Sequence, residues 1–141
     1  MMPSRHPSLA DLRRNHQSLA ATVEGIRADI RAYPRVRHKI PLLYGQLAEH
    51  LRWQDARFFD ALRRISENDR ETLKIIEFLF YELKEVKIAA VDFMEKYGEA
   101  AGNAVSRQFP KEFADFAAAI EGRLQMEAEY LFPLLEGMEA A

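Results

Sequence analysis

The chain has 141 residues, of which 48% are hydrophobic and 30% are charged, and its formal net charge is −2. This length and composition predict one soluble globular domain, residues 1–141 with a core from about 8 to 137, and exclude a disordered chain. The absence of cysteine excludes disulfides, thiolate zinc sites and a cysteine nucleophile. No stretch approaches the ~20 apolar residues of a membrane span, and residues 1–7 lack the apolar core of a signal peptide. We therefore expect a cytoplasmic protein without a membrane partner.

The charges are distributed unevenly. Residues 1–64 contain 12 Lys/Arg and 6 Asp/Glu, whereas residues 65–141 contain 8 and 16. One interpretation is that the basic first half packs against the acidic second half, within one chain or in a homodimer. The other is that a basic cluster binds an acidic partner protein or nucleic acid. Because Tyr33 is the only aromatic residue among these basic residues, we favour the first interpretation and expect no nucleic acid partner. The cluster consists of Arg27, Arg31, Arg35, Arg37, His38 and Lys39.

The first predicted element is a helix from about residue 8 to 32. Ser8 is a suitable N-cap, and Asp11 three residues later completes a capping arrangement. The helix should end near Tyr33, because the residue before a proline avoids the helical region. Apolar residues at alternating spacings of three and four define one buried face. That face is predicted to contain Leu9, Leu12, His16, Leu19, Val23, Ile26 and Ile30.

A second helix is predicted from about 38 to 66, with Pro41 in its first turn. Its expected buried face contains Ile40, Leu43, Leu47, His50, Gln54, Phe58, Leu62 and Ile65. After a turn at 66–69, a third helix should begin at a cap formed by Asn68 or Asp69 and stop before Gly98. Its expected buried face contains Leu73, Ile76, Phe80, Leu83, Lys87, Ala90, Met94 and Tyr97, with the Lys87 amine extending to the edge of the core.

Residues 99–109 are predicted to form the longest loop, and Pro110 then opens a fourth helix that reaches about residue 136. Pro133 should kink or end this helix. Its expected buried face contains Phe113, Phe116, Ile120, Arg123, Glu127, Leu131, Leu134 and Met138. Four long amphipathic segments with short connections predict an all-α fold, an antiparallel up-down-up-down four-helix bundle.

Four of the inward positions carry polar side chains, namely His16, His50, Arg123 and Glu127. All are expected at similar heights of the bundle, so their side chains should converge. Two histidines and a carboxylate, His16, His50 and Glu127, form the ligand set of a mononuclear iron site with open positions. In the alternative interpretation, Glu127 and Arg123 form a buried ion pair and the histidines hydrogen-bond to Gln54, Asp55 or Glu127. The spacing alone leaves both alternatives open.

Two segments and one dipeptide resemble the hemerythrin family, including its bacterial cation-binding domains. They are Leu47–Asp55 (LAEHLRWQD) followed by Phe58-Phe59, Arg123–Pro133 (RLQMEAEYLFP), and Asn15-His16 within Arg14-Asn15-His16. The resemblance covers nearly the whole chain and implies a hemerythrin-like four-helix bundle. It also implies a ligand pattern for two irons: a histidine on helix one, His-x-x-x-Glu on helix two, a histidine on helix three, and a second His-x-x-x-Glu on helix four.

The chain departs from this pattern at three of the six ligand positions. Gln54 stands at the helix-two carboxylate position, with Asp55 beside it, and Arg123 replaces the fourth-helix histidine. Helix three has no histidine, and Asp69 or Arg70 falls near the expected place. We therefore expect no intact di-iron centre. The resemblance implies that the retained residues belong to one metal position and the lost ones to its neighbour. Because a guanidinium is a fixed cation with five donors, we expect Arg123 in the vacated position, paired with Glu127 or Asp55.

These observations predict a non-enzymatic binding or sensory protein with at most one metal ion, either iron or another divalent transition metal. Its ligands would be His16, His50 and Glu127, and the resemblance implies oxygen, nitric oxide or iron as the signal. The side chains expected around these ligands are Gln54, Asp55, Arg123 and Arg70.

The alternative function is that of a metal-free protein-interaction regulator. Its polar layer fixes helix register, and its charged exterior binds a partner.

No serine is spaced with histidine and aspartate as in a hydrolase, and no glycine-rich phosphate loop is present. An iron-storage or redox enzyme is disfavoured, because a second carboxylate-rich site is missing.

Overall fold

The computed structural model describes the chain over residues 8–97 and 107–140, apart from the side chains of residue 33 and residues 138–140. These parts of the chain consist of helices and short turns and contain no β-strand. The expected all-α class is therefore confirmed. Most of the expected loop at 99–109, the N-terminal His6 and the side chain of Met138 lie outside the described residues.

Helix α1 (Leu9–Ala28) begins at the capping box that the sequence predicts. The Ser8 hydroxyl accepts a hydrogen bond from the Asp11 N–H, and the Asp11 carboxylate accepts one from the Ser8 N–H. The helix ends earlier than the expected residue 32. Pro34, expected to follow the helix, instead lies in the first turn of a short separate helix, α2 (Tyr33–Val36). A backbone N–H in the first turn has no hydrogen-bond partner within the helix, so the missing N–H of proline costs nothing there.

The second expected helix is broken in two. Helices α3 (Lys39–Arg52) and α4 (Ala56–Ile65) replace the single helix predicted over 38–66. The carboxylate of Asp55 accepts a hydrogen bond from the Phe58 N–H at 2.9 Å and so caps the start of α4. Ile65, expected on the buried face, is 62% exposed. The buried residues of α4 are Phe58, Phe59 and Leu62, so the buried face of the second segment ends before Ile65.

Helix α5 (Arg70–Tyr97) starts after Asp69, whose carboxylate accepts a hydrogen bond from the Thr72 N–H, as the sequence predicts, and it continues to the last described residue before position 98. Its buried face is rotated from the expected one, so that Val86 is buried and Lys87 is exposed. This rotation keeps the Lys87 amine in water, where its charge costs least. The buried residues of the helix are Ile76, Leu79, Leu83, Val86, Ala90, Phe93 and Tyr97.

Helix α6 (Phe109–Met126) has Pro110 in its first turn, as the sequence predicts. The chain then passes through a π-helical turn, η2 (Glu127–Leu131), and continues as α7 (Phe132–Ala140). The ring of Pro133 would clash with a carbonyl of the preceding turn in a regular α-helix, and the wider π turn lies directly before it. The sequence thus correctly predicts a disturbance near Pro133, although the helix does not end there.

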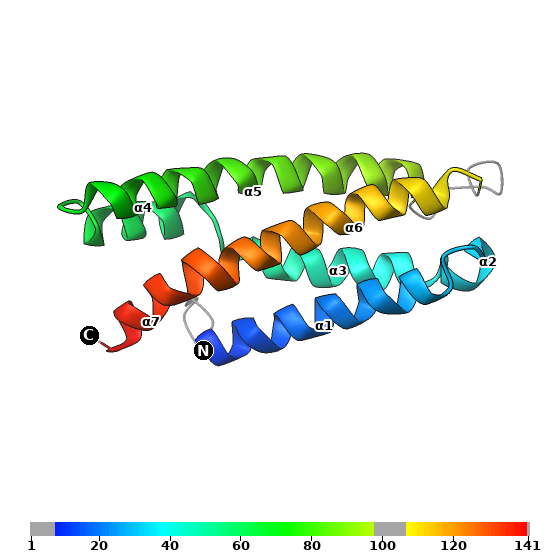
Figure 1. Ribbon diagram of the computed structural model, residues 1–141, viewed down its shortest axis with the longest axis horizontal. Helices are drawn as coiled ribbons and strands as arrows, with labels where there is room; N and C mark the ends of the chain where they lie inside the picture. The colour runs from blue at the N-terminus through cyan, green and yellow to red at the C-terminus, as the bar shows by residue number, and fades with distance from the viewer. Residues whose placement is uncertain (1–7, 98–106, 141) are drawn as a thin grey trace, which may run out of the picture.

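The long helices lie lengthwise beside one another (Figure 1). Helix α1 packs mainly against α3 and α5 mainly against α6, while contacts between α1 and α6 and between α3 and α5 join the two pairs. The core between them is one large cluster of aliphatic and aromatic side chains, and a smaller cluster of Leu9, Leu12 and Phe132 lies near the N-terminal end of α1. None of the described helices combines the length and the apolar character needed to cross a bilayer.

Ion pairs on the surface join the basic first half of the chain to the acidic second half. Arg27 of α1 binds Glu121 of α6 through two hydrogen bonds of 3.0 Å. Arg63 of α4 binds Glu77 of α5, with 2.5 Å between Nε and Oε2. These pairs agree with the interpretation that the two halves pack against each other within one chain.

Candidate functional site

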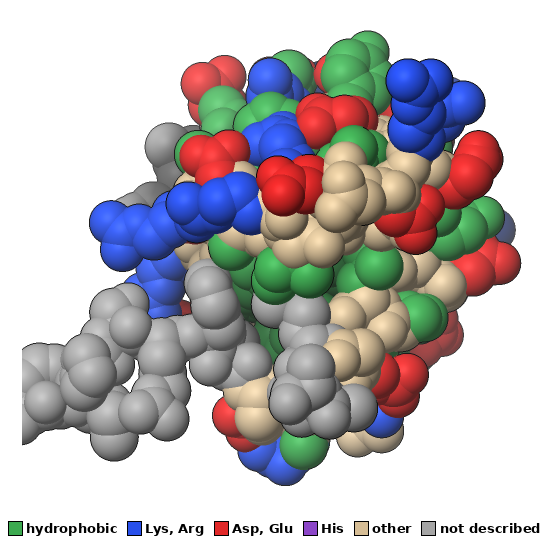
Figure 2. Space-filling model, turned by 90° about the vertical axis from the view of Figure 1, so that its left-hand side faces the viewer, with side chains coloured by type: hydrophobic (Ala, Val, Ile, Leu, Met, Phe, Trp, Pro, Cys, Tyr) green, Lys and Arg blue, Asp and Glu red, His purple; other side chains and the backbone are tan. Residues whose placement is uncertain are grey.

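The inward polar residues meet in one layer between the helices. His16 comes from α1, His50 from α3, Arg123 from α6, and Glu127 opens the π turn η2. His50, Arg123 and Glu127 are each no more than 2% exposed, and the side chain of His16 is 13% exposed. In the end view of Figure 2, no histidine is visible on the described surface. The predicted convergence of these four residues is therefore confirmed.

Glu127 is the centre of this layer. Its Oε1 lies 2.8 Å from His16 Nε2 and 2.5 Å from His50 Nε2. Its Oε2 accepts hydrogen bonds from Gln54 Nε2 and Arg123 Nε, each at 2.8 Å. Because an ionised carboxylate only accepts hydrogen bonds, both histidines must carry a proton on Nε2 in this arrangement.

Arg123 closes the network on the opposite side. Its Nη1 donates to the backbone carbonyl of Leu79 at 2.7 Å, and its Nη2 donates to Gln54 Oε1. Gln54, which is 0% exposed, therefore donates to Glu127 and accepts from Arg123. The guanidinium of Arg123 supplies one positive charge to balance the carboxylate of Glu127, so the buried layer is neutral when both histidines are neutral.

The environment keeps Glu127 ionised. Burial alone would raise the pKa of its carboxyl group, because a charge is poorly solvated in the interior. The hydrogen bonds from His16 and His50 lower the pKa of this carboxyl group. The positive charges of Arg123 and of His50, when it is protonated, lower it further, and together these effects outweigh the effect of burial. The pKa of Glu127 therefore lies well below its ordinary value, and its side chain is a carboxylate at neutral pH.

The break between α3 and α4 delivers Gln54 to this layer. Gln54 lies in the non-helical link 53–55, and its N–H bonds to the carbonyl of Leu51. Asp55, predicted as a side chain around the ligands, instead points to the backbone as the cap of α4 and is exposed. Arg70, predicted in the same role, is exposed at the start of α5. Both predictions are wrong, because capping and solvation satisfy these charges outside the core.

The cap makes a prediction about stability. Replacing Asp55 with alanine should lower the free energy of unfolding by about 1 kcal/mol, because the N–H of Phe58 loses its acceptor. Urea denaturation of the variant measures this loss. The matched control is Asp60→Ala on the same helix, which removes only an exposed contact with Arg63 and should cost less than about 0.5 kcal/mol. Equal losses in the two variants would show that the cap contributes nothing.

Aromatic rings surround the two histidines. The ring centroids of His16 and His50 are 4.9 Å apart, and Phe132 lies 4.7 Å from His16. Trp53 meets His50 edge-on at 6.2 Å. The buried Nδ1 of His50 and the buried Nε1 of Trp53 have no hydrogen-bond partner among the described residues. With its proton on Nε2, His50 thus has a buried Nδ1 that receives no hydrogen bond from the surrounding rings.

The group His16, His50 and Glu127 could hold one metal ion. Each offers a ligand atom, and these atoms all lie within 4.8 Å of one another. Nitrogen and oxygen ligands bind a zinc-sized ion at about 2.0–2.2 Å, so a small outward movement of the imidazoles would place such an ion between the three atoms. The other carboxylate oxygen, Oε2, is already hydrogen-bonded to Gln54 and Arg123.

No protein-family model, curated protein or solved structure matches this chain.

Proposed function

We propose that this protein is a non-enzymatic binding or sensory protein of the hemerythrin type, an up-down-up-down four-helix bundle with a reduced metal site. The site would bind at most one ion, iron, through His16, His50 and Glu127, and would respond to oxygen, nitric oxide or iron itself. The observation that supports this most directly is the convergence of two imidazole Nε2 atoms on one carboxylate oxygen in a buried layer.

The choice of ligands agrees with the chemistry of the ion. Two imidazoles and one carboxylate form the set found at mononuclear iron sites with open coordination positions. When bound, the ion would supply those open positions for a small ligand. The chain contributes the three donor atoms, and Gln54 and Arg123 hold the second oxygen of Glu127 in place. The aromatic rings around the histidines restrict the access of water.

Arg123 explains why only one ion is proposed. Its guanidinium lies against Glu127 Oε2, on the side of the carboxylate where a second bridged ion would have to bind. A fixed positive charge in the interior repels a second cation strongly, because the effective dielectric constant there is low. The same charge also opposes the first ion, so a weaker site than an intact dinuclear centre is expected.

Metal content tests this proposal. Protein purified without a histidine tag and loaded anaerobically with ferrous iron should hold about one equivalent per chain, measured by elemental analysis with a visible spectrum. His50→Ala should abolish loading, because it removes one of three ligands. His38→Ala is the matched control, since His38 is exposed at the start of α3, and it should load normally. Equal loading of the two variants would refute the site.

A second candidate function is that of a metal-free protein-interaction regulator. The observation that favours it is the state of His50, whose Nδ1 is buried without a partner. A histidine that binds a metal through Nε2 carries its proton on Nδ1 and almost always donates it to an acceptor. In the hydrogen-bonded network the proton sits on Nε2, and Nδ1 needs no acceptor. Iron loading below about a tenth of an equivalent in the wild-type protein would favour this candidate.

A further inference from the structure

A groove lies between α3 and α5, and none of the residues of the polar layer lines it. It has a volume of about 260 Å³ and is bordered by residues 44–52 of α3 and 87–91 of α5. Its floor is apolar, and its rim includes Tyr44 and Val91, which are 40% and 51% exposed. The small side chains of Ala48 and Ala90 fill little of the space between the two helices, which leaves the hollow.

The charged side chains that line this groove are all cationic. They are Arg52 and Lys87, and no carboxylate contributes to the lining. Arg52 pairs with Glu49 on its own helix at 2.6 Å, an exposed contact of little strength. Lys87 forms no ion pair with any residue in the described parts of the chain. The groove therefore combines an apolar floor with an unneutralised positive charge.

The exposed apolar side chains and the positive charges lie toward different ends of the groove. Figure 1 shows α3 and α5 running in opposite directions, so residues early in α3 lie beside residues late in this part of α5. Tyr44 and Val91 accordingly fall at one end, and Arg52 and Lys87 fall toward the other. A ligand that lies along the groove would meet apolar groups with one end and positive charge with the other.

We propose that this groove binds a single-chain amphiphile with a carboxylate head, that is, a fatty acid of medium length. The nine residues from Tyr44 to Arg52 span about 12 Å of helix, which an extended chain of about ten carbon atoms covers. The carboxylate would lie between Arg52 and Lys87, and the tail would cover Leu47, Leu51 and Val91. A partner helix is a poorer occupant, because an interface this short falls far below the area of a stable protein complex.

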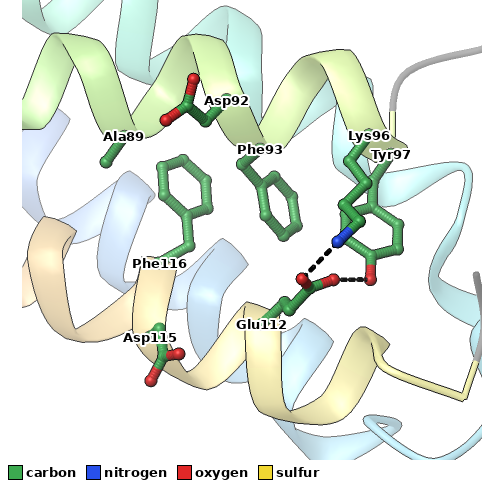
Figure 3. A pocket seen from close by; sticks show the side chains of 8 residues that line it. All are labelled: Ala89, Asp92, Phe93, Lys96, Tyr97, Glu112, Asp115 and Phe116. Carbon is green, nitrogen blue, oxygen red and sulfur yellow. Dashed lines mark hydrogen bonds and ion pairs between the residues drawn. The ribbon is translucent and has the colours of Figure 1, made fainter.

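The larger hollow between α5 and α6 does not share this pattern. In Figure 3 its floor consists of Phe93 and Phe116, and Glu112 at its rim binds both Lys96 and the hydroxyl of Tyr97. Its single lysine is thus already neutralised by a carboxylate. Asp92 and Asp115 add further negative charge. An anionic amphiphile is therefore expected to bind in the groove between α3 and α5 and not in the hollow between α5 and α6.

Calorimetric titration of the full chain with sodium carboxylates below their micelle concentrations tests the proposal. Decanoate should bind with one molecule per chain, and affinity should rise about two- to fourfold per methylene from hexanoate to decanoate, as buried CH₂ groups do. Decanol and decyltrimethylammonium should bind at least about tenfold more weakly, because the head lies between two cations. Equal binding of decanol and decanoate, or no binding of decanoate, would overturn the proposal.

Two variants locate the ligand. Lys87→Met should weaken decanoate binding about fivefold and leave decanol binding unchanged. Ala48→Trp fills the groove from an exposed position and should abolish binding, whereas Ala21→Trp on the exposed face of α1 should not. Circular dichroism verifies that both tryptophan variants remain helical. Unchanged decanoate affinity in Ala48→Trp would overturn the proposal. So would a dimer in sedimentation that this substitution dissociates, because a second copy would then occupy the groove. None of these substitutions touches His16, His50 or Glu127, so the metal proposal stands or fails separately.

Discussion

The Glu127→Ala variant is expected to lose about 3–5 kcal/mol of the free energy of unfolding, because it leaves the charge of Arg123 buried without a counterion. The side chain of Arg123 is 1% exposed, and Glu127 is the only carboxylate that pairs with it in the described structure. The remaining hydrogen bonds to Leu79 and Gln54 involve neutral acceptors. They do not compensate a full charge in the interior, so the variant must expose the guanidinium or distort the helices.

Urea denaturation of three variants separates the charge from other effects. Glu129→Ala, an exposed position in the same π turn, should change the stability by less than about 0.5 kcal/mol. Glu127→Gln keeps the shape of the side chain but removes its charge, and it should lose most of what the alanine variant loses. If Glu127→Ala were as stable as Glu129→Ala, the ion pair with Arg123 would not be part of the folded core.

The site was more predictable from the sequence than the ends of the helices. A polar residue at a core position is costly, so its presence on the buried face of a helical pattern is a strong signal. This signal identifies His16, His50, Arg123 and Glu127. The sequence does not identify the carbonyl of Leu79 as an acceptor for Arg123, because every residue type has a backbone carbonyl.

Helical periodicity wrongly predicts one continuous helix across the break between α3 and α4, because the apolar and polar pattern keeps the same spacing on both sides of it. His50, Gln54 and Phe58 keep a spacing of four across the link between α3 and α4, so the pattern predicts a continuous helix. The signal for the break is Asp55, which caps α4 three residues before Phe58, whereas the sequence predicts it among the side chains around the ligands. A polar residue next to a site can serve the backbone as readily as the site itself.

The rotated face of α5 shows a different limit. Apolar residues occupy adjacent positions at several turns, such as Leu79 beside Phe80 and Phe93 beside Met94. Two faces, one residue apart, therefore fit the same spacing. The structure takes the face that excludes Lys87, because burying an unpaired amine would cost more than exposing part of Phe80 or Met94.

The Arg123→Met variant is expected to lose about 3–5 kcal/mol in the absence of metal, since the carboxylate of Glu127 then lacks its cation. Methionine fills a similar volume without charge or donors. Two imidazoles and the carboxylate remain together, and no fixed cation opposes an ion between them. Metal affinity should therefore rise at least about tenfold, and stability should become dependent on metal.

Zinc is a suitable probe of this change, because it accepts two histidines and a carboxylate as ligands and has no redox chemistry. At a concentration 100-fold above the Kd, zinc should recover about 2.7 kcal/mol in Arg123→Met, measured by denaturation with and without the ion. The double variant Arg123→Met/His50→Ala should show no such recovery, because one ligand is gone. Equal stabilisation of the wild type and Arg123→Met by zinc would contradict the argument. It would mean that the guanidinium does not oppose the ion, and that neutrality of the layer is not what limits metal binding.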